Sequence, residues 1–417
     1  MNYLFIHNHY PGQFQHLVLH LVAQPGNRVV FISQPNDNRI EGLETVFYTP
    51  FRAASPTIHH YLGDIEQAVI WGQSVHEACR GLKAQGFRPD IVVGHSGWGE
   101  TLFVKDVWPD VPLLAYFEFY YRTEGADVGF DPTDPAGLND GPRLRVKNAV
   151  NLMAFQSCDW GLTATRWQAS LYPPEMRRRI SVLHEGIDTA VASPDAGAWL
   201  QISGLDAPLT RADELITFVN RNLEPYRGFR EFMRALPDIQ RRRPRARALI
   251  VGNDGLSYGS ASPDGRSWRQ VMTDEVGGQL DWSRVHFLGR VDYANFITLL
   301  RISSVHVYLT YPFVLSWSLL ESLSAGCAVV ASDVASVKEA IRDGQNGLLV
   351  DFFDRQGLCD AIDKVLDHPD RMQKMRNAAR KTVLDRYDLR TVALPRQLAL
   401  IQALIEGSDP RKAERVP

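Results

Sequence analysis

Short apolar segments alternate with helical stretches along almost the whole chain, and this alternation constrains the fold more than any other feature. One series of strand-like segments occupies residues 3–7, 28–33, 90–94, 112–119, 160–164 and 180–183. A second series occupies residues 215–219, 246–251, 285–288, 305–309, 328–331 and 347–350. Strands joined through helices build parallel sheets. The sequence therefore predicts an α/β protein made of two doubly wound, Rossmann-like domains.

The domain boundaries follow from length and local composition. A chain of 417 residues is too long for one hydrophobic core. Pro, Ala, Gly and Asp dominate residues 188–213, which indicates a linker. We expect an N-terminal domain over residues 1–200 and a C-terminal domain over 210–385. The C-terminal helix, about 386–417, is expected to pack back on the first domain.

Charge and cysteine usage narrow the class of protein. A formal net charge of −3 gives no electrostatic reason to expect a nucleic-acid partner. The four cysteines have neither metal-ligand spacing nor the density of a disulfide framework, which suits a reducing cytoplasm. The N-terminus lacks the pattern of a signal peptide, and no run of about 18 apolar residues indicates a membrane span. We expect a cytoplasmic protein, for which peripheral contact with the inner face of the membrane stays open.

The loop after the strand at 215–219 carries two arginines, Arg221 and Arg227. Ligands of open α/β sheets bind beyond the carboxyl ends of the strands. Two guanidinium groups there would hold a diphosphate and stabilise it as a leaving group. The alternative is a pair of solvated surface arginines.

The segment 310–326 leads from a strand through a serine-containing turn into a helix that begins near Ser316 or Ser318. Free backbone N–H groups at such a start receive phosphates. Glu321 lies one turn into the helix and has two interpretations. Its carboxylate either binds ribose hydroxyls or, with Ser318, forms a capping box for its own helix.

Candidates in the first half are weaker. His95 follows the strand at 90–94 and is placed to bind a sugar hydroxyl or relay a proton, although a lone histidine is often structural. Gly12, in the loop after the first strand, would admit a phosphate or a sugar. The acidic, Gly- and Pro-rich segment 123–142 is expected to be a long surface loop, either functional or a mobile insertion. The sequence contains no metal-ligand spacing, nucleophile elbow or P-loop.

Several motifs in a fixed order resemble one family. They are His-Glu-Gly-Ile-Asp at 184–188, Asn-Arg-x5-Arg-Gly at 220–228, Phe-Leu-Gly-Arg-Val at 287–291, Glu-x4-Gly at 321–326 and Asp-Gly-Gln-Asn-Gly at 343–347. Pro-Gly-Gln-Phe at 11–14 resembles the opening loop of one bacterial branch. Together these motifs resemble the retaining glycosyltransferases of family 4, which have the GT-B fold. The resemblance implies that the domain over residues 1–200 binds the acceptor, that the domain over 210–385 binds the donor, and that the two face a cleft.

The resemblance implies roles for individual residues. It places Arg221 and Arg227 on the donor diphosphate, as catalytic residues, and Glu321 on the nucleotide ribose. His95 corresponds to a histidine near the transferred sugar. The remaining donor-binding positions are Gly12, Arg290, Val291, Phe313, Val314, Leu315 and Ser316, with Arg290 and Val291 beside the nucleobase.

One position departs from the family pattern. The first glutamate of the family's E-x7-E motif would lie eight positions before Glu321, where this chain has Phe313. Phenylalanine neither carries charge nor accepts a bond from a hydroxyl. We expect the backbone of residues 314–316 to make the sugar contacts instead. The alternatives are a different donor or lost activity.

The resulting prediction is a retaining, metal-independent hexosyltransferase that needs no cofactor. It moves a sugar from a nucleotide diphosphate sugar, with UDP favoured over GDP, to a hydroxyl of a glycan, a lipid-linked acceptor or a small molecule. Glu118 and Arg122 are candidate acceptor-binding residues. The alternative is a catalytically silent homologue that binds a sugar nucleotide or a partner enzyme. A phosphorylase or a nicotinamide dehydrogenase is disfavoured, because their cofactor motifs are missing.

Overall fold

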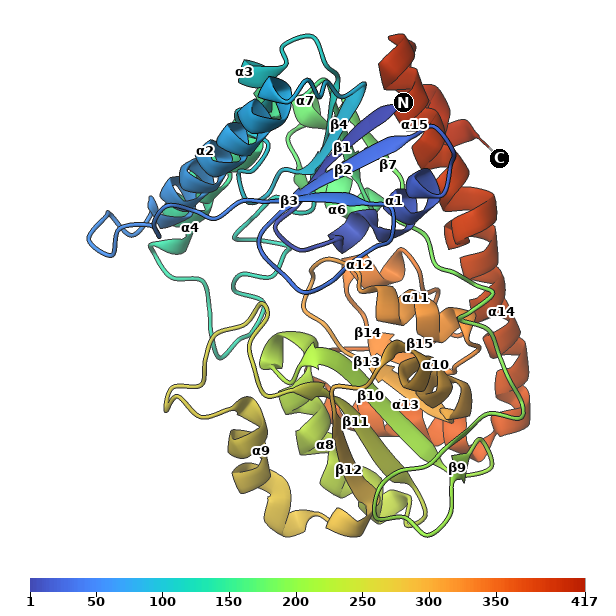
Figure 1. Ribbon diagram of the computed structural model, residues 1–417. Coiled ribbons are helices and arrows are strands. Elements are labelled where there is room, and N and C mark those ends of the chain that lie inside the picture. The colour runs from blue at the N-terminus through green and yellow to red at the C-terminus, as the bar shows by residue number, and fades with distance from the viewer. Residues whose placement is uncertain (417) are drawn as a thin grey trace. The chain divides into compact units, whose positions relative to one another are not determined.

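The computed structural model describes residues 1–416, and the chain forms two compact units (Figure 1). The first unit contains residues 1–186 and 389–417, of which Pro417 lies outside the described part. The second unit contains Ile187–Asp388. Each unit is built around one parallel sheet, which confirms the predicted fold class.

The first unit contains a seven-stranded sheet in the order β3-β2-β1-β4-β5-β6-β7. Its strands are β1 (Asn2–Ile6), β2 (Arg28–Ser33), β3 (Glu44–Phe47), β4 (Ile91–His95), β5 (Leu113–Tyr116), β6 (Trp160–Thr163) and β7 (Ile180–Val182). Every neighbouring pair is parallel, with Phe5 opposite Phe31 on one side and Val93 on the other. The central strands are buried on both faces, which is why they read as continuous apolar runs.

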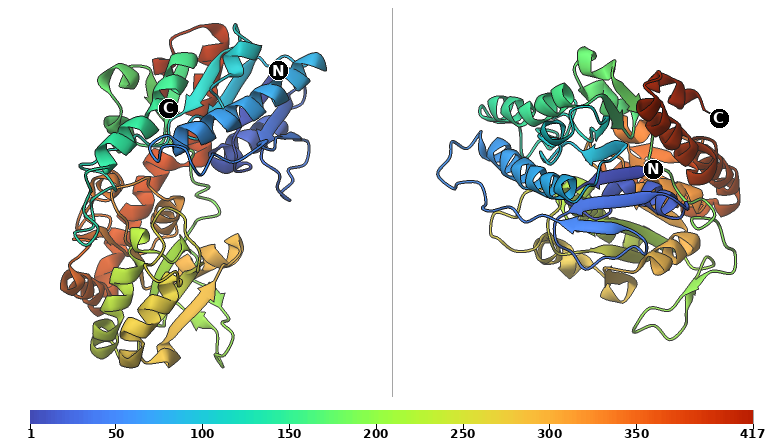
Figure 2. Two further views of the ribbon diagram at one scale, coloured as in Figure 1. Left: turned by 90° about the vertical axis from the view of Figure 1, so that its left-hand side faces the viewer. Right: turned by 45° about the horizontal axis from the view of Figure 1, so that its top comes forward.

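Helices cover both faces of this sheet. They are α1 (Gln15–Val22), α2 (Gly63–Ala84), α3 (Val104–Val107), α4 (Asp140–Lys147), α5 (Ala149–Ser157), α6 (Arg166–Leu171), α7 (Pro174–Arg177) and α15 (Leu394–Glu406), with short 3-10 helices at Gly12–Phe14 and Pro410–Arg415. Figure 2 shows α2 on one side of the sheet and α15 on the other.

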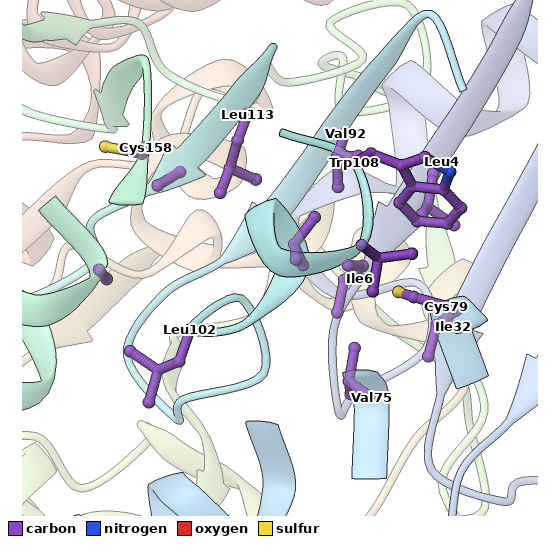
Figure 3. Close-up of a cluster of buried hydrophobic side chains, with 14 of the residues drawn as sticks. Leu4, Ile6, Ile32, Val75, Cys79, Val92, Leu102, Trp108, Leu113 and Cys158 are labelled. Atoms are coloured by element: carbon purple, nitrogen blue, oxygen red, sulfur yellow. The ribbon is translucent and has the colours of Figure 1, made fainter. Parts of the chain in front are cut away.

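Two apolar cores account for this layering. The core beneath α2 joins alternate residues of β1, β2 and β4 to the buried face of the helix (Figure 3). Its members include Leu4, Ile6, Ile32, Val75, Cys79, Val92, Leu102, Trp108, Leu113 and Cys158. The opposite core joins Phe5, Phe31 and Val93 to Leu400 and Ile401 of α15. The last helix of the chain therefore completes the first unit.

The second unit contains a six-stranded parallel sheet in the order β12-β11-β10-β13-β14-β15. Its strands are β10 (Leu215–Asn222), β11 (Arg247–Asn253), β12 (Val285–Gly289), β13 (Val305–Tyr308), β14 (Val329–Ser332) and β15 (Leu348–Val350). A separate antiparallel pair joins β8 (Trp199–Leu200) to β9 (Leu209–Thr210). The helices are α8 (Phe229–Arg242), α9 (Trp268–Val276), α10 (Tyr293–Ile302), α11 (Trp317–Ser324), α12 (Ala335–Lys338), α13 (Arg355–Asp367) and α14 (Pro369–Tyr387). Short 3-10 helices occupy Pro225–Arg227, Gly277–Gln279 and Trp282–Arg284, and a π-helical turn at Leu389–Ala393 begins the return to the first unit.

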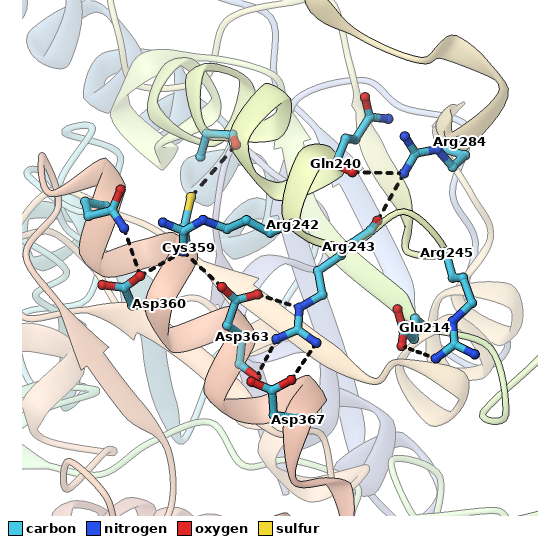
Figure 4. Close-up of polar contacts among 12 residues, drawn as sticks. Glu214, Gln240, Arg242, Arg243, Arg245, Arg284, Cys359, Asp360, Asp363 and Asp367 are labelled. Carbon is cyan, nitrogen blue, oxygen red and sulfur yellow. Dashed lines mark hydrogen bonds and ion pairs between the residues drawn. The ribbon is translucent and has the colours of Figure 1, made fainter.

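An ion-pair network joins α8 to α13 at the surface of the second unit (Figure 4). Arg242 contacts Asp360 and Asp363, and Arg243 contacts Asp363 and Asp367 at distances of 2.5–2.9 Å. Each arginine thus has two carboxylate partners. These cations are satisfied by the fold and have a structural role.

The residues predicted as a linker belong to the second unit. Arg301 of α10 donates to the carbonyls of Val191 and Ser193, and Arg380 of α14 donates to those of Thr189 and Ala192. These bonds attach the start of the segment 188–213 to the second unit. The boundary after Gly186 is therefore earlier than composition predicts, because side chains distant in sequence hold this stretch.

Candidate functional site

The strand order of each sheet reverses at one place, and polar side chains gather beyond the strand ends there. In the first unit β1 and β4 adjoin, and in the second unit β10 and β13 adjoin. Ligands of doubly wound sheets bind in the crevice at this reversal. Of the predicted site residues, Gly12, Arg227 and residues 313–316 follow these strands, and His95 and Arg221 lie at the ends of β4 and β10.

In the second unit, Arg227 reaches from the loop after β10 to the loop after β13. Its Nη1 donates to Thr310 Oγ1 at 2.7 Å and to the Val314 carbonyl at 3.3 Å. Gly228 permits this approach, because its φ is +73° and a Cβ there would lie 2.2 Å from Leu309 Cβ. The turn into α8 is therefore closely packed against the end of β13.

Within residues 1–416, no carboxylate forms an ion pair with the buried Arg227, and Glu224 acts on it only through Coulombic attraction. It is 7% exposed, and its hydrogen bonds go only to hydroxyl and carbonyl oxygens. A buried charge is costly unless an opposite charge compensates it. Arg221 and Arg290 are exposed and make no hydrogen bond or ion pair within residues 1–416. Within residues 1–416, these three guanidinium groups at or beyond the carboxyl ends of β10 and β12 form no ion pair with a carboxylate, which favours an anionic ligand.

Helix α11 begins beside Arg227. Ser316 is its N-cap, with the side-chain oxygen accepting from the Ser318 N–H, and the Ser316 N–H donates to the Tyr308 hydroxyl at 3.1 Å. Both N–H groups therefore have partners in this structure. The Val314 carbonyl likewise accepts from Arg227. Leu315 is buried, so its side chain contributes packing.

Glu321 does not cap its helix, so the capping-box interpretation is wrong. The cap is Ser316, two residues before the serine that the motif Ser318–Glu321 requires. The Glu321 carboxylate accepts a hydrogen bond from the Tyr293 hydroxyl at 2.8 Å instead. Burial raises the pKa of Glu321, and the bond from Tyr293 opposes this shift. A buried carboxylate that is not used for capping remains available to bind a ligand hydroxyl.

Phe313 lies against aromatic rings and Arg227. Its ring centroid is 4.9 Å from that of Tyr258 and 5.1 Å from that of Tyr226. The Arg227 guanidinium carbon lies 5.7 Å from the Phe313 ring and 5.1 Å from the Tyr258 ring. The position that carries a glutamate in the family motif is therefore part of an aromatic cluster. Val291, by contrast, is half-buried after β12, beside the exposed Arg290.

In the first unit, the ends of β1 and β4 bring two histidines together. The ring centroids of His7 and His95 are 4.7 Å apart, and both side chains are buried. Gly12 lies against His7: with φ +56°, a Cβ there would lie 2.7 Å from the imidazole. This explains the glycine by packing against a protein ring, independently of any ligand.

A chain of hydrogen bonds leads from His7 to Glu118. His7 Nε2 lies 2.7 Å from Gln13 Oε1, and its Nδ1 lies 2.9 Å from the His9 backbone nitrogen and 2.8 Å from Asn8 Oδ1. Gln13 Nε2 then donates to Glu118 Oε1 at 2.7 Å. On the other side, His95 Nδ1 accepts from the Gly97 N–H, and His95 Nε2 lies 3.5 Å from Glu118 Oε2. Both carboxylate oxygens therefore face donors.

This arrangement keeps Glu118 ionised. Burial alone would raise the pKa of Glu118, but the His95 and Gln13 donors outweigh burial and lower it. Burial and the neighbouring His95 hold the pKa of His7 well below its usual range. The cluster thus presents a partly exposed anionic oxygen pair beside neutral His7.

Arg122 has a structural role in this structure. Its guanidinium donates to the carbonyls of Ser170 and Leu171 at the end of α6. These bonds use Nε and Nη2 of Arg122 and do not involve its Nη1. The roles of Glu118 and Arg122 in binding an acceptor stay predictions.

Sequence reasoning missed several residues of these clusters. Glu100 is fully buried, its Oε1 accepts from the Tyr48 hydroxyl at 3.0 Å, and burial raises its pKa to about 7. Tyr258 lies in a loop without a recognisable motif, and Glu224 occupies one of the unspecified positions of the motif at 220–228. Gln13 was the most visible of them, since it lies in the Pro-Gly-Gln-Phe loop at 11–14. The others become neighbours only through the fold.

Two family models match the chain. Residues 25–192 match the model described as Glycosyl transferase family 4 group, and residues 206–382 match the model described as Glycosyl transferases group 1. Among curated proteins, glycogen synthase of Mycobacterium tuberculosis is 28% identical over 315 residues, covering 74% of this chain and 68% of that protein. The phosphatidyl-myo-inositol mannosyltransferase of the same organism is 31% identical over 205 residues, covering 48% of this chain and 49% of that protein.

Solved structures resemble the whole chain. Sucrose-phosphate synthase from Thermosynechococcus elongatus matches with a TM-score of 0.72 at 17% identity, covering 98% of this chain and 100% of that one. HepE from Anabaena, in complex with UDP and glucose, matches with a TM-score of 0.64 at 17% identity, covering 97% and 99%. These likenesses, with the two doubly wound units, define a protein of the GT-B fold. The matched family models show more specifically that the chain belongs to the family 4 and group 1 glycosyltransferases, and is an enzyme of that class.

Within residues 1–416, no three His, Cys, Asp or Glu side chains are grouped so that they could hold a metal ion. Metal independence nevertheless stays a prediction. None of the helices in the same range combines the length and apolar character needed to cross a bilayer.

Proposed function

We propose that this glycosyltransferase uses a nucleotide diphosphate sugar, with UDP as the preferred nucleotide, and retains the anomeric configuration. The observation that carries the proposal is Arg227, a buried guanidinium beside the start of α11 that forms no ion pair with a carboxylate of residues 1–416. A diphosphate would supply an ion-pair partner. The solved complex of HepE with UDP and glucose supports UDP as the nucleotide.

The proposed donor site assigns one task to each group. Arg227 and Arg221 bind the diphosphate, and Glu321 accepts hydrogen bonds from the ribose hydroxyls, while Arg290 and Val291 adjoin the base. Negative charge grows on the diphosphate as the glycosidic bond breaks. Each preorganised donor aimed at that charge contributes about 3 kcal/mol, or roughly two orders of magnitude in rate.

The transfer step needs no protein nucleophile and, in this proposal, no metal ion or cofactor. The acceptor hydroxyl attacks the anomeric carbon from the face that the diphosphate leaves, and its proton passes to the departing phosphate oxygen. The bond from the anomeric carbon to the phosphate oxygen breaks and the bond to the acceptor oxygen forms on the same face of the sugar, so the configuration is retained. Glu118 and His95 of the first unit are proposed to bind sugar or acceptor hydroxyls, the acceptor being a glycan, a lipid-linked sugar or a small molecule.

Phe313 favours a second candidate function, a homologue that binds a sugar nucleotide without turnover. Calorimetric titration with UDP, GDP and ADP, followed by mass spectrometry of donor hydrolysis, separates the two. We expect one nucleotide to bind tightly, with binding lost in Arg227→Ala and kept in Arg241→Ala, whose side chain is exposed and paired with Asp238. Slow release of sugar supports the enzyme. Binding without release or transfer to any screened acceptor supports the silent homologue, and no binding contradicts the donor site.

A further inference from the structure

We propose that Tyr258 is a specificity-determining residue that stacks on the donor sugar, and that Phe313 and Glu224 position it. This inference rests on the proposed donor site. It explains why a phenylalanine is compatible with that site at the position where a carboxylate is expected.

Tyr258 is exposed at the proposed donor site. Its side chain lies beside the Arg227 guanidinium, with 5.1 Å between the guanidinium carbon and the ring centroid, yet 47% of the residue is exposed. Arg227 and Phe313 are 7% and 6% exposed. Among these three neighbours, the Tyr258 ring is the one with a surface open to a ligand. A sugar attached to a diphosphate on Arg227 would lie within reach of that ring.

Glu224 holds the loop that carries Tyr258. Glu224 is completely buried, and its carboxylate accepts hydrogen bonds from three consecutive backbone N–H groups, those of Ser257, Tyr258 and Gly259, at 2.9–3.3 Å. Charge-assisted bonds of this kind are stronger than neutral ones. Glu224 immediately precedes the short helix that ends at Arg227. The same turn therefore positions both Arg227 and the loop that carries Tyr258.

The rings of Phe313 and Tyr226 lie against the Tyr258 ring. The Phe313 ring lies 4.9 Å from that of Tyr258 at an interplanar angle of 56°, and Tyr226 lies 5.7 Å from it. Aromatic pairs at such separations attract each other beyond their buried area. A glutamate at position 313 would bring a charge into this cluster instead of a ring. Where the family motif has a hydrogen-bonding carboxylate, this chain therefore has Phe313, whose ring supports Tyr258. The Tyr258 ring would stack on the apolar face of a sugar ring.

The test compares a free nucleotide with its sugar conjugate. Dissociation constants for UDP and UDP-glucose, and for GDP and GDP-mannose, are measured by calorimetry on the full chain with Tyr258, Tyr258→Phe and Tyr258→Ala. We expect Tyr258→Ala to weaken the nucleotide sugar roughly tenfold, as for loss of one good aromatic contact, while the free nucleotide changes less than twofold. Tyr258→Phe keeps the ring and should bind both ligands as the native protein does.

Glu224→Gln provides the positioning test. It keeps the shape of the side chain but weakens the three bonds to the loop, so it should reproduce the selective loss of sugar affinity to a smaller degree. Equal weakening of nucleotide and nucleotide sugar in Tyr258→Ala, or no change in either, overturns the stacking role. Failure of the native protein to bind any nucleotide overturns the proposed function itself, and that result is distinguishable because it precedes any substitution.

Discussion

Arg227 is the side chain that most strongly supports the proposed donor site. Its guanidinium is buried and forms bonds only to neutral oxygens, so its charge stabilises whichever anion occupies the site. We expect Arg227→Ala to reduce donor turnover by about a hundredfold or more. The turnover of Arg227→Lys should lie between that of the native protein and that of Arg227→Ala. Lysine keeps the positive charge but lacks the planar guanidinium that can donate two parallel hydrogen bonds. Hydrolysis of the best-bound nucleotide sugar measures both, and near-native turnover in Arg227→Ala contradicts the assignment.

Because Arg227 is buried, its loss also affects packing. Thermal unfolding of Arg227→Ala, compared with Arg241→Ala as an exposed control, separates a local effect on chemistry from a general loss of structure. Folded variant protein that still fails to turn over the donor supports the catalytic role.

Glu321 leads to a prediction about pH. Burial raises the pKa of this carboxyl, so protonation sets in at a higher pH than for an exposed glutamate. Ribose hydroxyls need an acceptor, and protonation converts one oxygen to a donor. Nucleotide affinity should therefore fall as the pH decreases through the raised pKa. Dissociation constants measured across acidic pH check this, and Glu321→Gln should show weaker binding with a flatter pH profile. A variant whose pH profile matches the native one excludes Glu321 as the titrating group.

Glu100 leads to a prediction about stability. Burial raises its pKa to about 7, whereas an exposed glutamate titrates near 4.5. Between these values the folded state holds a proton that the unfolded state has released, so stability is present below pH 4.5 and is lost as the pH rises through 7. The change amounts to roughly 3 kcal/mol across this window.

The measurement is chemical denaturation of native protein and Glu100→Gln between pH 4.5 and 8. The glutamine variant cannot ionise, so its unfolding free energy should increase relative to that of the native protein as the pH rises. Parallel pH dependences of the two proteins would show that Glu100 keeps an ordinary pKa.

At the scale of elements, the turn between β10 and α8 depends on Gly228. Its φ of +73° disfavours a side chain, and a Cβ would approach Leu309 to 2.2 Å. Gly228→Ala should destabilise the second unit by roughly 2–3 kcal/mol through crowding and backbone strain. Gly344 is a matched control, because it has φ +68° but nothing within 4 Å of its ideal Cβ. Denaturation curves should show Gly344→Ala losing about 1 kcal/mol. Equal losses in the two variants would assign the whole effect to φ.

The strands were predictable wherever burial on both faces produces a continuous apolar run. β2 has the predicted bounds, Arg28–Ser33, and the other central strands differ from prediction only at their ends. β3 escaped prediction because it lies at the sheet edge and has no buried residue: Glu44 and Phe47 are exposed, and the two residues between them are half-buried. The pair β8–β9 has two residues in each strand, too few for a sequence pattern.

The candidate site was only partly predictable, for the same physical reason. Arg221, Arg227 and Glu321 lie in loops or helix starts that follow predicted strands, so topology alone places them near a ligand edge. The capping motif at Ser318–Glu321 misled because capping needs a particular backbone conformation, which Ser316 adopts. The bond from Gln13 to Glu118 spans 105 positions, and no local pattern encodes such a contact.

At the scale of the whole molecule, the order of the chain differs from the order of the units. The chain leaves the first unit after Gly186 and returns to it at Leu389. Leu400 and Ile401 then enter the core of the first sheet beside Phe5 and Phe31. The first unit is therefore incomplete until the last residues have been synthesised, whereas the second unit is continuous.

This connectivity predicts that truncation affects the two units unequally. A chain ending at Asp388 would expose the apolar face that α15 covers, so the first unit should lose protection against hydrogen exchange in β1, β2 and β4. Strands β10 to β15 should keep theirs, because all of their neighbours remain. Leu400→Ala should weaken only the first unit, by about 2–5 kcal/mol, and Gln402→Ala, at an exposed position of the same helix, should change little. Retained protection of β1 in the truncated chain would mean that the sheet of the first unit is stable without its last helix, and that α15 lies on a core which other elements already hold together.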